Sequence, residues 1–313
     1  MEIITLILLG GVGFTAYKLF KEKKKRTIGN TIDNGKKVVE EVYDTVGEKI
    51  KEIKETLLST SGSYIFIGPP ESGKTVFFIT MVDRLLRLQI EKDMPYEMTF
   101  RTKETEDFIT QMINEMAKSK WPLKTAKGNI YEVDITTRNV LFMKSNGILS
   151  FHDYGGEVFL DAFSGPEIGS ESKFKEEAEA MKVEIKQAKG IFLVIDTVEL
   201  YNNMQEEKLL NCLFYLSDFL KKERNKNMRL AVIFTKSDQF IEKDSLFNPE
   251  SIFKEKYPNA YVNFKNRNTR YFFVTAIKEP IIIDGKYMPP KNYKSTDSVN
   301  ILEAAKWMLE IND

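Results

Sequence analysis

The sequence predicts an α/β fold, a mostly parallel β-sheet with helices on both faces. Short continuous apolar runs alternate with longer segments of helical period, as expected for buried parallel strands connected by helices. With 313 residues, 42% of them hydrophobic, the chain is long enough for one large domain with appendages. The runs predicted as strands are 64–67, 147–153, 190–196, 229–235 and 271–274. The main predicted helices follow the first run and cover about 170–189, 205–222 and 297–311.

The first element is an apolar segment from Ile3 to Phe20, in which Lys18 is the only charged residue. As a helix this segment is about 27 Å long, close to the thickness of the hydrocarbon core of a bilayer. A polybasic flank follows, opposed only by Glu22, and the positive-inside rule then places the rest of the chain in the cytoplasm. We expect residues 1–26 to be a single transmembrane anchor, with a buried core helix as the alternative.

Residues 27–61 are expected to form a helical stalk or linker. Their apolar residues are spaced alternately four and three apart, the a/d pattern of a coiled coil: Val39, Tyr43, Val46, Ile50, Ile53 and Leu57. Fewer than three heptads disfavour a free-standing coiled coil, so this stripe is expected to pack on its own domain or on a partner. The remaining residues, 62–313, are expected to form the globular domain, with a helical insertion at about 90–125.

The octapeptide Gly68-Pro69-Pro70-Glu71-Ser72-Gly73-Lys74-Thr75 fits the phosphate-loop pattern G-x-x-x-x-G-K-[ST]. It lies between a predicted strand and a predicted helix, where backbone N–H groups and the helix N-terminus surround a phosphate chain. Lys74 is expected to reach the β- and γ-phosphates, and the Thr75 hydroxyl to ligate Mg²⁺. Gly68, Glu71, Ser72 and Gly73 complete the expected phosphate contacts. A chance turn before a helix is the alternative, and the context disfavours it.

A second motif, Asp153-Tyr154-Gly155-Gly156-Glu157, ends the next strand run. Asp153 is expected to hold Mg²⁺ through water, and Gly156 to offer its N–H to a γ-phosphate. Glu157 stands where a water-positioning side chain is needed, with His152 and Tyr154 as alternatives. Because a carboxylate adds negative charge beside a developing anion, slow hydrolysis is expected.

Two further motifs follow strand ends, Thr235-Lys236-Ser237-Asp238 and Thr275-Ala276-Ile277. The ordered set resembles the loops of the Ras-like, translation-factor-related P-loop GTPases, over about residues 64–311. The resemblance implies that Asp238 reads the guanine ring, that the Lys236 stem packs on the base, and that Thr275 and Ala276 give a backbone contact. The family usually has Asn where Thr235 stands and S-A-K in the last loop. An ATP-using P-loop enzyme remains an alternative.

Within that superfamily the chain resembles two subgroups. The β-subunit of the signal-recognition-particle receptor has a similar membrane helix, linker and phosphate loop. Prokaryotic double-GTPase proteins have a similar helical insertion and a W-P-x-x-T segment, here Trp121 to Thr125. Thr125 is therefore the candidate for a mobile threonine that closes on Mg²⁺ and the γ-phosphate, with Thr102 and Thr105 as competitors.

Composition narrows the function. Basic and acidic residues both number 46, so no overall basic surface indicates nucleic acid, and a single cysteine, Cys212, excludes an intrachain disulfide. We expect a membrane-anchored protein that binds GTP, GDP and Mg²⁺, hydrolyses GTP slowly, and recruits a protein partner at the cytoplasmic face through its stalk or mobile loops. A nucleotide-loaded receptor or scaffold subunit with little turnover is the alternative.

Overall fold

The computed structural model describes residues 62–91, 94–122, 129–138, 144–152, 154–165, 174–198, 206–223, 227–238, 248–265 and 268–311. The predicted anchor and stalk, residues 1–61, lie outside this part of the chain, and so do Thr125 and Asp153. Within the described ranges, no helix is both long enough and apolar enough to cross a membrane.

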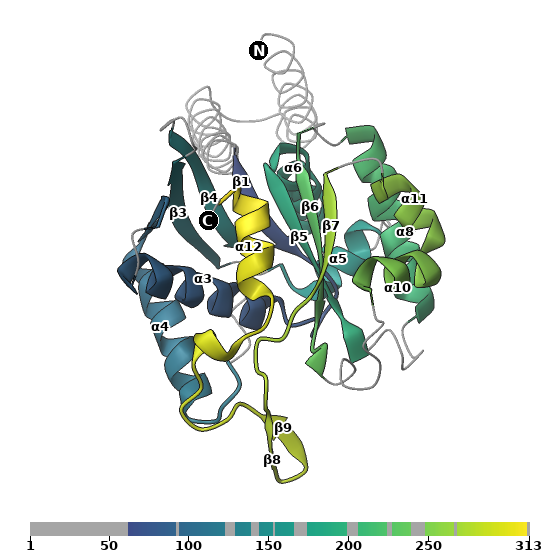
Figure 1. Cartoon of the computed structure of the whole chain (residues 1–313). Helices are drawn as coiled ribbons and strands as arrows, with labels where there is room; N and C mark the ends of the chain where they lie inside the picture. The colour runs from purple at the N-terminus through teal and green to yellow at the C-terminus, as the bar shows by residue number, and fades with distance from the viewer. Residues whose placement is uncertain are drawn as a thin grey trace, which may run out of the picture. The chain divides into compact units, whose positions relative to one another are not determined.

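A seven-stranded sheet organises the domain, as the α/β prediction required (Figure 1). Its strand order is β2-β3-β4-β1-β5-β6-β7, in which β4, β1, β5, β6 and β7 run parallel and β2 and β3 add an antiparallel edge. The strands are β1 Ser63–Ile67, β2 Tyr96–Phe100, β3 Ile130–Arg138, β4 Lys144–His152, β5 Gly190–Asp196, β6 Arg229–Thr235 and β7 Thr269–Phe273. All five predicted strands are therefore present.

Helices cover both faces of this sheet (Figure 1). One face packs against α3 (Lys74–Glu91), α4 (Lys103–Ala117) and α12 (Ile301–Leu309). The other packs against α5 (Gly156–Ala162), α6 (Lys175–Gln187), α8 (Glu206–Glu223), α10 (Pro249–Lys256) and α11 (Pro258–Lys265). Strand β5 is buried throughout and alternates between the two cores, with Phe192 in the first and Leu193 in the second. Its continuous apolar sequence is the result of this double burial.

Aromatic rings fill the core directly under the predicted phosphate loop. Phe66 on β1 stacks on Phe192 of β5, with ring centroids 4.7 Å apart, and meets Phe78 of α3 edge to face at 5.1 Å. These contacts fix the end of β1 against the first turns of α3. The loop that joins these two elements therefore starts and ends on a rigid base.

The region at about 90–125, where a helical insertion is expected, contains a strand as well as a helix. Helix α4 lies there, but residues 96–100 form strand β2, paired antiparallel with β3. The alternation of buried Tyr96 and Met98 with exposed Glu97 and Thr99 is the period of a half-buried edge strand. Strand β2 was not predicted, because its pairing partner β3 is not revealed by local sequence.

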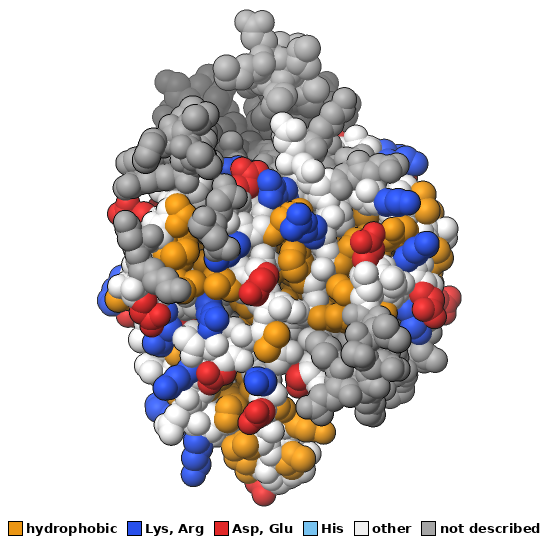
Figure 2. All heavy atoms as spheres, in the orientation of Figure 1, with side chains coloured by type: hydrophobic (Ala, Val, Ile, Leu, Met, Phe, Trp, Pro, Cys, Tyr) orange, Lys and Arg blue, Asp and Glu red, His pale blue; other side chains and the backbone are white. Residues whose placement is uncertain are grey.

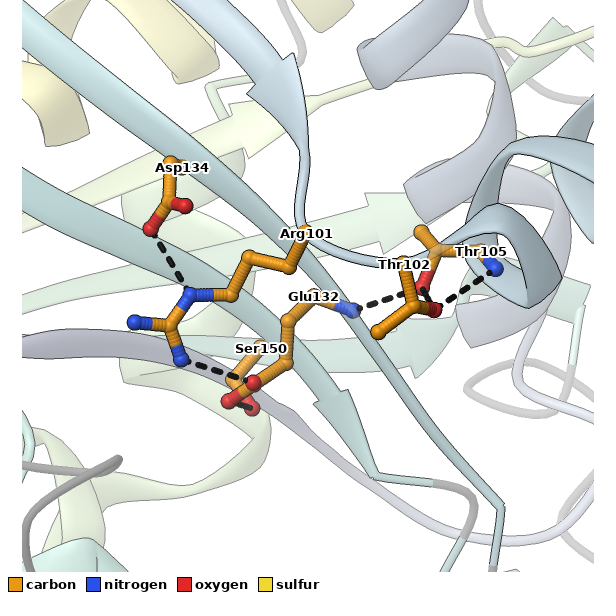
Figure 3. Close-up of polar contacts among 6 residues, drawn as sticks. All are labelled: Arg101, Thr102, Thr105, Glu132, Asp134 and Ser150. Carbon is orange, nitrogen blue, oxygen red and sulfur yellow. Dashed lines mark hydrogen bonds and ion pairs between the residues drawn. The ribbon is translucent and has the colours of Figure 1, made fainter.

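A polar cluster fastens this edge to the rest of the sheet (Figure 3). Arg101, just after β2, donates from Nε to Asp134 at 2.8 Å and from Nη1 to Glu132 at 2.9 Å, both on β3. The other Glu132 oxygen accepts from Ser150 of β4 at 3.3 Å. Thr102 caps α4 by accepting from the Thr105 N–H. The two competing switch threonines, Thr102 and Thr105, therefore have structural roles.

A small hairpin follows β7, formed by β8 (Ile281–Ile283) and β9 (Lys286–Met288). Ile282 and Tyr287 are 67% and 56% exposed, and apolar side chains are visible over the hairpin in Figure 2. The Trp121 indole N–H donates to the Tyr287 carbonyl at 2.7 Å. The W-P segment is thus attached to the chain that follows the last nucleotide loop.

The aromatic core gives a stability prediction. Phe66→Ala removes a 3%-exposed ring that contacts four other rings, and should lower the free energy of unfolding by about 3–5 kcal/mol. The control Ile282→Ala truncates an exposed side chain and should change it by about 0.5 kcal/mol or less. Denaturant unfolding measures both, and equal effects would contradict the packing described here.

Candidate nucleotide site

The phosphate loop connects β1 to α3 and has a backbone that only glycine tolerates at its first position. Gly68 has φ 151°, and a Cβ there would lie 2.1 Å from the carbonyl oxygen of Val194 on β5. Gly73, with φ 85°, turns the chain into α3. The loop is therefore pressed against the end of β5, with its N–H groups and the N-terminus of α3 on one side.

Lys74 crosses the interior of the loop. Its Nζ donates to the carbonyls of Gly68 and Pro69 at 2.9 and 2.7 Å, and the residue is only 9% exposed. The first turn of α3 contains no acidic residue, so the helix dipole and the ammonium act together on an anion. Ser72 Oγ is buried and has no hydrogen-bond partner among the described residues. A buried cation, an acid-free helix start and an unpartnered hydroxyl fit a bound phosphate chain.

The T-K-S-D loop after β6 is bonded directly to the phosphate loop. Thr235 Oγ1 donates to the Ser72 carbonyl at 2.7 Å, and lies 3.2 Å from the Ile195 carbonyl at the end of β5. The ammonium of Lys236 donates to the Glu71 carbonyl at 3.3 Å. Thr235, which stands where the family usually has Asn, therefore joins the two loops through its hydroxyl.

Asp238 and the T-A-I loop lie next to each other. Asp238 is half-buried, and Thr275 Oγ1 donates to its carboxylate at 3.4 Å. Burial raises the pKa of Asp238, while hydrogen bonds from its own backbone and from Thr275, and the charge of Lys236, oppose that rise. Ser237 Oγ donates to the Val274 carbonyl at 3.0 Å, which fixes the spacing of the loops. Ala276 follows, partly buried against the core. These bonds hold the T-K-S-D and T-A-I loops side by side.

Gly156 brings the second motif against the first. A Cβ on Gly156 would lie 1.9 Å from the nitrogen of Pro70 and 2.2 Å from its Cα, so the two backbones are in contact. Gly156 begins α5, and Glu157 in the first turn is exposed. The structure therefore places Gly156 at the phosphate loop and leaves the Glu157 carboxylate accessible to water.

His152 and Tyr154, the alternatives for positioning water, are bonded to the interior instead. His152 Nδ1 lies 2.6 Å from Glu184 Oε1 on α6, and the Tyr154 hydroxyl donates to the same oxygen at 2.7 Å. Burial and then the Glu184 charge raise the pKa of Tyr154, so the phenol stays protonated. These contacts attach the end of β4 to α6. Glu184 was not foreseen from the sequence, because a single acid within a helix gives no signal of its buried partner.

The predicted metal ligands are described only in part. Thr75 lies at the start of α3, whereas Thr125 and Asp153 fall outside the described residues. Within the part of the chain that the structure covers, no cluster of three or more His, Cys, Asp or Glu side chains has the arrangement of a metal site.

The comparison with family models decides the classification. The Double-GTPase 1 model matches residues 65–272, about two thirds of the 313-residue chain. The chain belongs to the Double-GTPase 1 family. It is therefore a GTP-binding P-loop protein, and its ligands are GTP or GDP with Mg²⁺. The resemblance to double-GTPase proteins is confirmed. The comparison does not support the resemblance to the β-subunit of the signal-recognition-particle receptor.

Other comparisons add little to this Double-GTPase 1 assignment. A comparison with curated proteins gave no match. Among solved structures, Roco2 RocCORdC of Methanosarcina barkeri bound to GDP is similar at 14% identity, with a TM-score of 0.34. The match covers 80% of this chain and 49% of that one, so the chain spans about half the length of the Roco2 structure.

The loop-to-loop bond gives a first test of the site. Thr235→Val keeps the shape but removes the donor to Ser72, and should weaken GDP binding about tenfold. Thr235→Ser retains the hydroxyl and should bind GDP nearly as the parent does. Titration with a fluorescent GDP analogue measures both, and a Val variant with parental affinity would show that the bond does not shape the site.

The backbone contact at Gly156 gives a second test. Gly156→Ala places a methyl group where Pro70 stands, so the two motifs can no longer meet. GDP binding should persist, whereas GTP hydrolysis should fall on the order of 100-fold because Gly156 is displaced from its predicted contact with the γ-phosphate. Gly165→Ala is the matched control, since a Cβ there meets nothing within 4 Å. Equal hydrolysis by both variants would rule out a role for this contact.

Proposed function

We propose that this protein is a membrane-anchored GTP switch that hydrolyses GTP slowly and recruits a protein partner at the cytoplasmic face. The observation that carries the switch is the contact of Gly156 with the backbone of Pro70. The contact supports a switch because a glycine backbone at the phosphate loop lies close to where a γ-phosphate would bind, and in this proposal its position changes when that group is present. Its neighbour Glu157 is exposed and free to act on solvent.

Each residue of the site has a definite part in this proposal. Lys74 neutralises the β- and γ-phosphates, and the Thr75 hydroxyl helps to hold Mg²⁺, which supplies further charge neutralisation when bound. Gly156 donates its N–H to the γ-phosphate, and Glu157 orients the attacking water. Because a carboxylate accepts the water proton but also repels the developing phosphate charge, turnover is slow.

Sequence supports the anchor and the partner. The apolar segment from Ile3 to Phe20 and the basic residues after it have the length and charge bias of a single span with a cytoplasmic domain. The a/d stripe of the stalk offers a partner helix an apolar surface. In this proposal residues 1–26 are the anchor, 27–61 the stalk and 62–313 the GTP-binding domain.

A second function is a GTP-loaded scaffold subunit with almost no turnover. The observation that favours it is the presence of Pro69 and Pro70 in the phosphate loop, of which Pro69 is buried. Proline has no N–H to donate to a phosphate, and its ring stiffens the backbone. A scaffold and a switch bind the same nucleotide. They differ in whether the chain itself completes the hydrolysis of bound GTP.

Single-turnover hydrolysis by the GTP-loaded full chain distinguishes the slow switch from the scaffold subunit. The switch proposal predicts measurable conversion to GDP, and about a tenfold acceleration in Glu157→Gln, which keeps the water-orienting oxygen and removes the charge. The control Glu179→Gln also removes one acidic side chain, but from the exposed surface of α6, and should hydrolyse GTP at the parental rate. No conversion in either the parent or Glu157→Gln would favour the scaffold.

A further inference from the structure

Strand β5 ends in an acid that belongs to none of the nucleotide motifs. Asp196 is 5% exposed, and its carboxylate makes two contacts. Oδ1 accepts from the Val198 N–H at 2.8 Å, and Oδ2 lies 2.5 Å from the Lys236 ammonium. A carboxylate and an ammonium at this distance form a charge-assisted hydrogen bond, which fixes the position of the ammonium.

The sheet determines this contact. In the parallel register of β5 and β6, Asp196 is the partner of Thr235, the residue just before Lys236. All seven residues of β5 are buried, so the carboxylate sits on a rigid strand. Lys236, by contrast, has a left-handed φ of 56° and a 41%-exposed side chain. A non-glycine residue in that conformation is held there by its surroundings.

Lys236 connects Asp196 to the phosphate loop. The ammonium that meets Asp196 also donates to the Glu71 carbonyl at 3.3 Å. One cation thus joins β5, the T-K-S-D loop and the phosphate loop. Its methylene stem is the part that the family resemblance assigns to the guanine face, so the direction of this stem depends on where the ammonium is bound.

We propose that Asp196 is a positioning residue that sets how long the protein retains guanine nucleotide. It fixes the Lys236 ammonium at the end of β5, and thereby keeps the stem against the base. The inference rests on the GTP-binding site described above. It adds a residue outside the motifs, on a strand end, that acts through Lys236.

Charge repulsion alone predicts the opposite effect of neutralising Asp196 on nucleotide binding. Asp196 is an anion in a site for polyanions, so its neutralisation would tighten phosphate binding if Coulomb repulsion dominated. The positioning role instead predicts faster release of GDP after neutralisation. It also predicts no loss of affinity for inorganic tripolyphosphate, because that ligand has no base to contact Lys236.

The decisive experiment measures release of a fluorescent GDP analogue from the full chain. Asp196→Asn keeps the size and the acceptor for Val198, and should release GDP about tenfold faster with unchanged tripolyphosphate competition. Asp218→Asn removes an exposed ion pair on α8 and should release GDP at the parental rate. In a Lys236→Met background, Asp196→Asn should have no further effect, because the two residues act as one unit.

The outcomes separate this inference from the proposed function. Parental release by Asp196→Asn, slower release, or a full tenfold effect that persists in Lys236→Met would overturn the positioning role. An equal loss of tripolyphosphate affinity would also overturn it, since that result indicates a general loss of structure. If the parent chain itself retained no GDP, the GTP-binding assignment would fail instead.

Discussion

The site depends on a hydrogen bond between loops that are 163 residues apart in sequence, from Thr235 Oγ1 to the Ser72 carbonyl at 2.7 Å. Strand β5 lies between β1 and β6, so the loop after β6 reaches the phosphate loop only across the end of β5. Thr235 also approaches the Ile195 carbonyl there, which aligns three strand ends. The start of α3, and with it Lys74, therefore depends on the position of the guanine loop.

The charged side chains around this junction fall into two groups, one at the phosphate loop and one at the loops that follow β6 and β7. Lys74 and the acid-free start of α3 lie at the phosphate loop, whereas Asp238, which the family resemblance assigns to the base, lies beside Thr275. Lys236 lies between them, bonded to Asp196 and to the phosphate loop. The link between the two loops is therefore the Thr235 bond, while Lys236 joins the end of β5 to the loop after β6.

Much of this arrangement could be predicted from the sequence. The central parallel strands are buried on both faces and appear as continuous apolar runs, as in β5, and the loops that follow them carry the motifs. Strand β2 was missed because a half-buried edge strand gains its stability from pairing with β3 rather than from local pattern. The Asp196–Lys236 and His152–Glu184 pairs depend on strand register and helix packing, which no local spacing encodes.

The most direct test of the account is the identity of the nucleotide that co-purifies with the full chain. The protein is denatured after purification in Mg²⁺, and the released nucleotide is identified by chromatography and mass spectrometry. The site predicts GDP or GTP in close to one copy per chain, and its loss in Lys74→Ala. Adenine nucleotide at that occupancy, or an equal amount of guanine nucleotide in Lys74→Ala, would contradict the account.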